Sequence, residues 1–319
     1  MAKSSHLQPA AIVLLALGIV APLIVLSGAS SPSPDFGELE TVWGQLGGQP
    51  GFFQKPRAIA ISPDDELFIV DKSARIQVYD QDGEYLRGWK TPEWQYGKPT
   101  GLSFDLDGNL MVADTHYYRI LFYTPEGELL EEKTIGGVSG PEPGQLGWVT
   151  DCVQDSRGCY YVSEYGELDR VQKFSPEGEY LWGWGSHGEG PLEFKRPQNL
   201  AIDEEDHLWI VDACNHRVLE FDVGGDAPKL IQQWGTLGDE PGQLRYPYDI
   251  VLHGKFVYIC EYGNHRIQKF TRDGQSLAVW GKIGREEGEL HTPWAMATDS
   301  KDRVHIVDTL NQRVQRLRL

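Results

Sequence analysis

Three oxygen-bearing side chains occupy matching places in this chain and could bind a cation together. Asp151, Asn199 and Asp249 each lie two residues after a proline, or after its replacement, at the start of a short apolar segment. Carboxylate and amide oxygens are the ligands that Ca²⁺ takes in proteins. Alternatively, consecutive side chains of a strand point to opposite faces, so these three could turn to a neighbouring element and accept its backbone hydrogen bonds. The residues alone leave both interpretations open.

The residue directly after each proline or its replacement is of a different chemical kind. Across the repeats described below, these positions are Arg57, Thr100, Thr150, Gln198, Tyr248 and Trp294. A cation, hydroxyls, an amide and aromatic rings suit binding by hydrogen bonds and ring faces. With two nearby tyrosines, the predicted ligand-binding set is Arg57, Gln198, Tyr248, Trp294, Tyr165 and Tyr262. The alternative is that the rings simply fill a central channel.

These positions match because six copies of one pattern run from about residue 56 to the end of the 319-residue chain. Each copy has an apolar segment, an Asp/Gly turn, a second apolar segment that closes on an acid, and an Arg that opens a third. The closing acids, 43 to 50 residues apart, are Asp71, Asp114, Glu164, Asp212, Glu261 and Asp308. Such a period indicates stacked units, none of which can bury its apolar face alone.

The fourth copy shows how one unit should fold. Residues Asn199–Asp203 and Leu208–Asp212 alternate around a turn, as two antiparallel strands do. Val218–Phe221 follows as a third strand, and the segment ending at Trp234 is the fourth. A glycine-rich loop then leads to the next copy, so four strands make one blade of a propeller.

Counting strands predicts how the ring closes. The last copy stops at Leu319, at the end of its third strand, whereas the short segment Glu40–Trp43 precedes the first copy without a blade of its own. A ring must cover its last strand edges, so the N-terminal strand should complete the C-terminal blade. The predicted fold is an all-β, six-bladed propeller of four-stranded blades over residues 40–319.

The turn between the second and third strands carries a specific motif, Asp-x-x-Asn-x-Arg. It is fullest at Asp212–Arg217, Glu261–Arg266 and Asp308–Arg313, while the acid-to-Arg spacing is one residue shorter in the first copy and one longer in the third. Together with the Trp-Gly loops and the inner-strand prolines, this motif resembles that of the NHL repeat family of six-bladed propellers. The resemblance implies a binding scaffold for a protein, a peptide or a small ligand.

We expect the turn motif to be structural. The acid and the Arg should pair across the turn, and the Asn should adopt its left-handed backbone conformation. His216 and His265 follow that Asn in two copies and are expected to be exposed turn residues.

Enzymes with this architecture suggest the rival functions. Peptidyl-hydroxyglycine lyases resemble NHL propellers that hold zinc through His residues directly after the inner-strand Pro; no residue is His at those positions here, and catalytic zinc normally takes three protein ligands. Gluconolactonase-like propellers place calcium-binding Asn and Asp at much the same ring. The alternative function is therefore a calcium-dependent lyase or hydrolase using Asp151, Asn199 and Asp249; otherwise no cofactor is expected.

The N-terminus and the charge predict where the protein acts. Residues 1–29 read as a signal peptide or signal anchor, because the uncharged run Ala10–Leu26 follows Lys3 and precedes acids, and residues 30–39 read as a linker. We therefore expect an extracytoplasmic body, tethered to the membrane if the segment is not cleaved. The net charge of −18 argues against a nucleic-acid partner.

Four cysteines offer two interpretations. Cys152, Cys159, Cys214 and Cys260 are predicted to be buried apolar fillers. Because Cys152 and Cys159 flank one turn, and because an exported protein can form disulfides, a bridge across that hairpin is the alternative.

Overall fold

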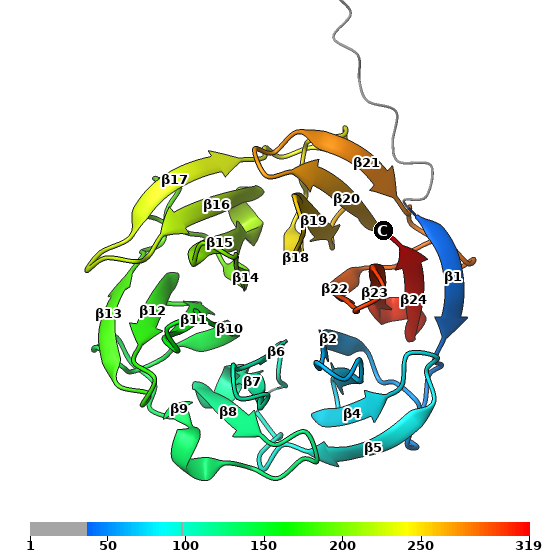
Figure 1. The fold of residues 1–319 in the computed structure, drawn as a ribbon, viewed down its shortest axis with the longest axis horizontal. Coiled ribbons are helices and arrows are strands. Elements are labelled where there is room, and N and C mark those ends of the chain that lie inside the picture. The colour runs from blue at the N-terminus through cyan, green and yellow to red at the C-terminus, as the bar shows by residue number, and fades with distance from the viewer. Residues whose placement is uncertain (1–36, 97) are drawn as a thin grey trace, which may run out of the picture. The chain divides into compact units, whose positions relative to one another are not determined.

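The computed structural model describes residues 37–96 and 98–319, and these residues form six four-stranded antiparallel sheets arranged as blades around an axis (Figure 1). The predicted six-bladed propeller is therefore confirmed. The predicted signal segment and residues 30–36 of the predicted linker lie outside the described residues. Within the described part, no helix has the length and apolar character needed to cross a bilayer.

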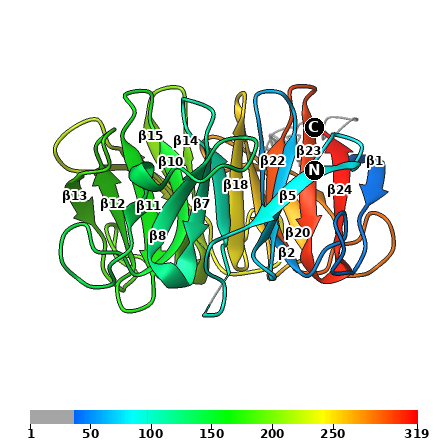
Figure 2. The same ribbon diagram turned by 90° about the horizontal axis from the view of Figure 1, so that it is seen from below.

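The blades follow one another along the chain, and blades one to five each run from their inner to their outer strand (Figures 1 and 2). In blade six the outer strand comes from the N-terminal side of the first blade. Blades one to three are β2 (Pro56–Ile61), β3 (Leu67–Asp71), β4 (Arg75–Tyr79), β5 (Tyr85–Lys90); β6 (Gly101–Phe104), β7 (Leu110–Asp114), β8 (Arg119–Tyr123), β9 (Ile135–Gly136); and β10 (Trp148–Gln154), β11 (Tyr160–Tyr165), β12 (Arg170–Phe174), β13 (Tyr180–Trp184). Blades four to six are β14 (Pro197–Ile202), β15 (His207–Asp212), β16 (Arg217–Asp222), β17 (Lys229–Trp234); β18 (Pro247–His253), β19 (Phe256–Glu261), β20 (Arg266–Thr271), β21 (Ser276–Trp280); and β22 (Pro293–Thr298), β23 (Arg303–Asp308), β24 (Arg313–Arg318), β1 (Glu38–Trp43).

The last blade is closed by the N-terminal strand, as predicted. Strand β1 pairs antiparallel with β24, with Trp43 opposite Val314. The strand begins at Glu38, two residues earlier than expected, and the Gly37 N–H extends the pairing by donating to the Arg318 carbonyl at 3.0 Å. This pairing covers the outer edge of β24, which the end of the chain would otherwise leave open.

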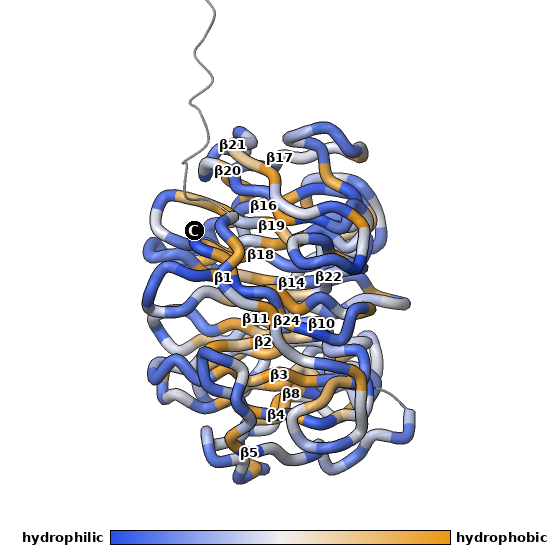
Figure 3. Tube along the Cα trace, turned by 90° about the vertical axis from the view of Figure 1, so that its right-hand side faces the viewer, coloured by the Kyte–Doolittle hydropathy of each residue, from blue (hydrophilic) through white to orange (hydrophobic). Residues whose placement is uncertain are grey.

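Apolar side chains pack between neighbouring blades, so the core is divided among six interfaces. Figure 3 shows the apolar strands lying inside more polar loops. At the interface of blades six and one, the Trp43 ring lies 4.8 Å from Tyr79 and 5.7 Å from Phe53, measured between ring centroids. Ring closure therefore buries aromatic surface in addition to pairing backbone groups.

The predicted pairing of acid and Arg is confirmed. In blade four, Arg217 Nε donates to Asp212 Oδ2 at 2.9 Å, and its Nη2 donates to the carbonyls of Gly190 and Glu193 in the preceding interblade loop. The guanidinium thus joins a strand end to the loop that enters the blade. Even with the shorter spacing of blade one, Arg75 reaches Asp71 at 2.6 Å.

The predicted role of the motif Asn is wrong. Asn215 ends the 3₁₀ turn η3 (Ala213–Asn215), and the left-handed conformation belongs to the next residue, His216, with φ of 56°. The Asn215 amide instead donates to Asp212 Oδ2 at 2.7 Å and to the Gly188 carbonyl at 2.8 Å. A 3₁₀ turn needs its last residue in a right-handed conformation, so the reversal of the backbone falls one residue later.

The two turn histidines are half-buried and not exposed as predicted. Nδ1 of His216 accepts a hydrogen bond from the Tyr246 N–H at 3.1 Å, and Nδ1 of His265 accepts one from the Thr292 N–H at 2.9 Å. Tyr246 and Thr292 begin the entry into the following blade, where both have positive φ. Each ring therefore fastens one blade to the next.

The cysteines do not all behave as fillers. Cys152 and Cys260 are buried, but Cys159 is half-buried and Cys214 is exposed on its turn, and all four are free thiols. In the hairpin, Cys152 is opposite Val162 and not opposite Cys159. The strand register therefore separates the two thiols that could have formed a bridge.

Candidate binding site at the channel mouth

In five of the six blades, a β-bulge places the residue after the inner-strand proline or its replacement at one mouth of the channel. Pro56 is opposite Asp71 and Ala58 is opposite Val70, so Arg57 between them has no partner. The same register shift leaves four further residues unpaired, namely Thr150, Gln198, Tyr248 and Trp294. A bulge bends the strand and re-aims the extra side chain. The predicted ring of side chains is thus created by a repeated backbone irregularity.

Aromatic rings from blades five and six form the centre of the site. The Tyr248 and Tyr262 rings stack with centroids 4.5 Å apart, and the edge of Trp294 meets Tyr248 at 5.0 Å. The Arg57 guanidinium from blade one lies over Trp294 at 5.1 Å. Residues far apart in the sequence therefore share one surface.

Blade four adds a residue that the sequence analysis missed. The Arg196 guanidinium lies 4.8 Å from the centre of the Tyr165 ring and 5.1 Å from that of Tyr248, and its Nε donates to Gln198 Oε1 at 2.8 Å. The structure thus brings together all six residues of the predicted ligand-binding set and joins them through Arg196. Whether they bind a ligand stays a prediction.

A signal for Arg196 was present in the sequence. A basic residue directly precedes the inner-strand proline in three copies, as Lys55, Lys98 and Arg196. Lys55 and Arg196 have positive φ of 54° and 61°, which is unusual for any residue with a side chain and more so before proline. The repetition of charge at a strained position could have identified it.

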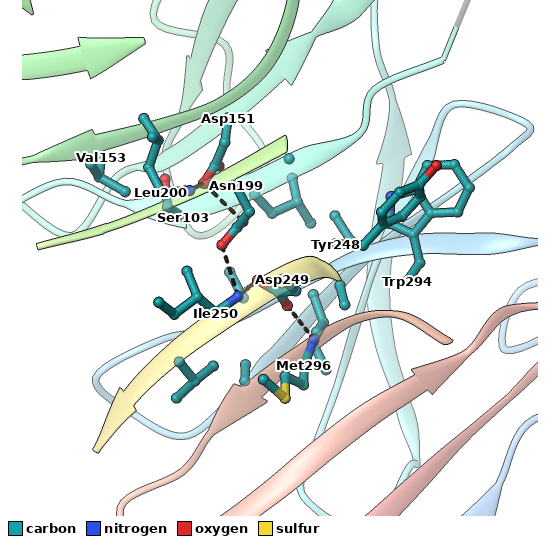
Figure 4. A pocket seen from close by; sticks show the side chains of 18 of the residues that line it. Ser103, Asp151, Val153, Asn199, Leu200, Tyr248, Asp249, Ile250, Trp294 and Met296 are labelled. Carbon is teal, nitrogen blue, oxygen red and sulfur yellow. Dashed lines mark hydrogen bonds between the residues drawn. The ribbon is translucent and has the colours of Figure 1, made fainter. Parts of the chain in front are cut away.

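The oxygen-bearing side chains of Asp151, Asn199 and Asp249 border the channel and accept hydrogen bonds that join neighbouring blades (Figure 4). Asp151 Oδ2 accepts from the Leu200 N–H at 3.0 Å and from the Asn199 amide at 2.9 Å. Asn199 Oδ1 in turn accepts from the Ile250 N–H at 3.2 Å. The structural interpretation, in which these side chains bond to the next blade, is confirmed for both.

Asp249 continues the same chain of bonds. Its two carboxyl oxygens accept from the Met296 N–H at 2.5 Å and from the Ile250 N–H at 2.9 Å. Asp151, Asn199 and Asp249 also line an axial cavity of about 270 Å³, together with Tyr248 and Trp294. The bulge breaks the strict alternation of the strand, so successive residues can both border the channel.

Burial disfavours the ionised form of both Asp151 and Asp249. It raises the pKa of Asp151 to about 7, against the stabilising N–H of Leu200. Burial also raises the pKa of Asp249 well above its usual range, and the nearby Asp151 adds to that effect. Within the described residues, Asp151 Oδ1 is the axial carboxyl oxygen that has no hydrogen-bond partner.

These donors do not fit a calcium ion. Ca²⁺ takes six to eight oxygen ligands, whereas the carboxyl oxygens of Asp249 and the amide oxygen of Asn199 already accept backbone hydrogen bonds. One remaining oxygen, on an acid whose charge is disfavoured, is too few. Calcium binding by Asp151, Asn199 and Asp249 stays a prediction, and the hydrogen bonds that these side chains form do not favour it.

A different acid cluster lies at the hairpin between β14 and β15. In the described part of the chain, one group of three side chains has the types and the spacing that a metal ion needs. The possible ligand atoms of Asp203, His207 and Glu220 all lie within 4.8 Å of one another. His207 Nδ1 lies 2.9 Å from Glu220 Oε1, and Asp203 is occupied by the Trp209 indole N–H at 2.9 Å. We interpret this cluster as turn structure.

A larger cavity adjoins the site on its blade-three side. It holds about 570 Å³ between blades two and three, and its lining includes Tyr118, Trp148 and Tyr165. The Trp148 ring, which is 41% exposed, lies 5.4 Å from the Tyr165 ring. Because Tyr165 also contacts Arg196, the channel mouth and this side cavity share a wall.

Comparisons with known proteins agree with the fold. A family model, DUF5128, described as a 6-bladed beta-propeller, matches residues 149–231. NHL repeat-containing protein 3 of Homo sapiens is 24% identical over 210 residues, which is 62% of this chain and 58% of that protein. The chain thus spans little more than half the length of this relative.

Two further similarities involve enzymes. Peptidyl-alpha-hydroxyglycine alpha-amidating lyase 1 of Drosophila melanogaster is 32% identical over 209 residues, covering 62% of this chain and 32% of that protein. The structure of virginiamycin B lyase from Staphylococcus aureus superposes with a TM-score of 0.55 at 15% identity, covering 83% of this chain and 80% of the other. At that identity the likeness concerns the fold alone.

The blades, their closure and the turn motif define a six-bladed β-propeller. Its aromatic and arginine side chains gather at one mouth of the central channel. The repeats and the relatives place it further: the chain is similar to NHL repeat proteins, and a six-bladed β-propeller family model matches part of it.

Proposed function

We propose that this protein is an extracytoplasmic binding scaffold, secreted or membrane-tethered, whose site for a protein, a peptide or a small ligand is the channel mouth. The observation that carries the proposal is the continuous surface of ring faces and guanidinium groups formed by Arg57, Arg196, Tyr165, Tyr248 and Trp294. Arg and aromatic side chains dominate binding energies where they gather at the centre of a site. The neighbouring side cavity gives an extended ligand such as a peptide a place to continue.

Binding without a metal is part of this proposal. The second candidate, a calcium-dependent lyase or hydrolase, is favoured by one observation, the buried Asp151 Oδ1 without a partner. The other axial oxygens already accept hydrogen bonds, which supports the scaffold in preference to the enzyme.

A ¹⁹F NMR screen of the full chain with neutral, acidic and basic fluorinated fragments tests the proposal. Binders should be lost in Tyr248→Ala and in Trp294→Ala, because each removes a ring from the centre of the site, and retained in Tyr85→Ala, whose ring lies on an outer strand. EDTA should change nothing. Binding that EDTA abolishes and calcium restores would instead establish the metal-dependent alternative.

The location of the body has its own test. The proposal rests on Lys3 before the apolar run and on acids after it. Protease added to intact spheroplasts should digest the propeller while a cytoplasmic marker enzyme survives. Digestion only after lysis would place the propeller in the cytoplasm and refute this part of the proposal.

A further inference from the structure

Two arginines at the channel mouth differ from the arginines of the repeat motif. The motif arginines each form an ion pair with the acid that closes the preceding strand, and they are Arg75, Arg119, Arg170, Arg217, Arg266 and Arg313. Arg57 and Arg196 have no carboxylate partner among residues 37–96 and 98–319, and both are half-buried. In a chain with 47 acids and 29 basic residues, two such unpaired cations at one place call for an explanation.

The surroundings of these arginines leave their donor edges available. The Arg57 guanidinium packs on Trp294, and that of Arg196 packs between Tyr165 and Tyr248. Aromatic partners contact a guanidinium over the ring face and accept none of its in-plane hydrogen bonds. Among the described residues, the side-chain hydrogen bond that these two guanidinium groups donate is the one from Arg196 Nε to Gln198 Oε1.

Other cations reinforce the positive charge. Burial lowers the pKa of Arg57, and the charge of Arg196 contributes in the same direction. Burial lowers the pKa of Lys98 too, with further contributions from Arg57 and Lys72. Charges that raise one another's free energy in this way favour an anion among them, and a recess with one sign of charge concentrates counter-ions.

We propose, on the basis of the binding function above, that Arg57 and Arg196 recognise the carboxylate of a small ligand whose flat body packs against the partly exposed rings of Tyr262 and Trp294. The guanidinium fork matches a carboxylate in two parallel hydrogen bonds. Tyr248 is 7% exposed between the Tyr262 ring and the Arg196 guanidinium, so it holds these two groups in place, and an aromatic ligand can add to the ring cluster at its exposed side. The adjoining axial cavity, which Tyr248 and Trp294 also line, holds about 270 Å³, slightly less than the ~300–1,000 Å³ typical of ligand pockets, so the space beside these rings suits a small molecule.

A matched pair of probes tests the proposal by ¹⁹F NMR on the full chain: 4-fluorobenzoate and its neutral analogue 4-fluorobenzamide. The benzoate should bind at least about tenfold more tightly, because its carboxylate makes charge-assisted hydrogen bonds. Arg57→Gln and Arg196→Gln should each weaken benzoate about tenfold and leave the amide unchanged. Arg285→Gln, on an exposed loop, is the control.

The remaining outcomes separate this inference from the proposed function. If both probes bind equally and both are lost in Tyr248→Ala, the mouth binds ligands but carboxylate recognition is refuted. If neither probe binds, carboxylate recognition is refuted, and the fragment screen above decides the proposed function separately. Complete displacement of benzoate by equimolar inorganic phosphate would show that charge alone is recognised and would also overturn the inference. Arg196→Lys keeps the charge without the fork, so it should bind benzoate less tightly than the unaltered protein; unaltered melting temperatures would show that the variants are folded.

Discussion

Deleting residues 36–44 from the chain should lower the melting temperature by about 10–20 °C. The deletion removes β1, which exposes the edge of β24 and strips Trp43 from its contacts with Tyr79 and Phe53. Trp43 is partly buried, so its loss costs somewhat less than the about 3–5 kcal/mol of a fully buried Trp. Each kcal/mol corresponds to roughly 2–4 °C in a domain of about 150–250 residues. The ion pairs of Glu40 with Arg316 and Arg318 are lost as well.

Thermal unfolding followed by circular dichroism measures this effect. Deletion of residues 27–35, which removes the same length of chain but keeps β1, is the control and should melt like the unaltered protein. Equal melting temperatures for the two deletions would show that β1 does not hold the ring closed.

Replacing Arg217 or Arg266 with Ala should destabilise the propeller by roughly 3 kcal/mol, which corresponds to a fall in melting temperature of about 6–12 °C. Each substitution leaves a fully buried acid, Asp212 or Glu261, without its guanidinium partner. Each also frees carbonyls of the interblade loop, such as those of Gly190 and Glu193.

Urea unfolding of both variants provides the measurement, with Arg245→Ala as the exposed control. The two motif variants should lose similar amounts of free energy of unfolding, because the contacts they remove are equivalent. Unchanged stability in either variant, combined with loss of fragment binding, would mean that the motif arginine serves the ligand site and not the fold.

The sequence determined the architecture, because the same pattern of strands and turns can be recognised in each of the six repeats. The spacing of the closing acids and the unmatched segment Glu40–Trp43 were enough to predict six blades and the strand that closes them. The ring after the inner-strand prolines also followed from register alone. Equivalent positions of equivalent blades must meet around one axis, so Arg57, Tyr248 and Trp294 could be grouped without coordinates.

Only the tertiary structure decided what that ring contains and how it is held. The bulge that frees residues such as Tyr248 depends on pairing with the second strand, and sequence periodicity does not report an extra residue in one strand. Arg196 joins the site because its positive φ turns it toward Tyr165 and Tyr248 on other blades. The hydrogen bond from the Tyr246 N–H to His216 likewise crosses between blades. Contacts of this kind depend on backbone geometry at blade junctions, whereas a repeat pattern reports only what each blade shares with the others.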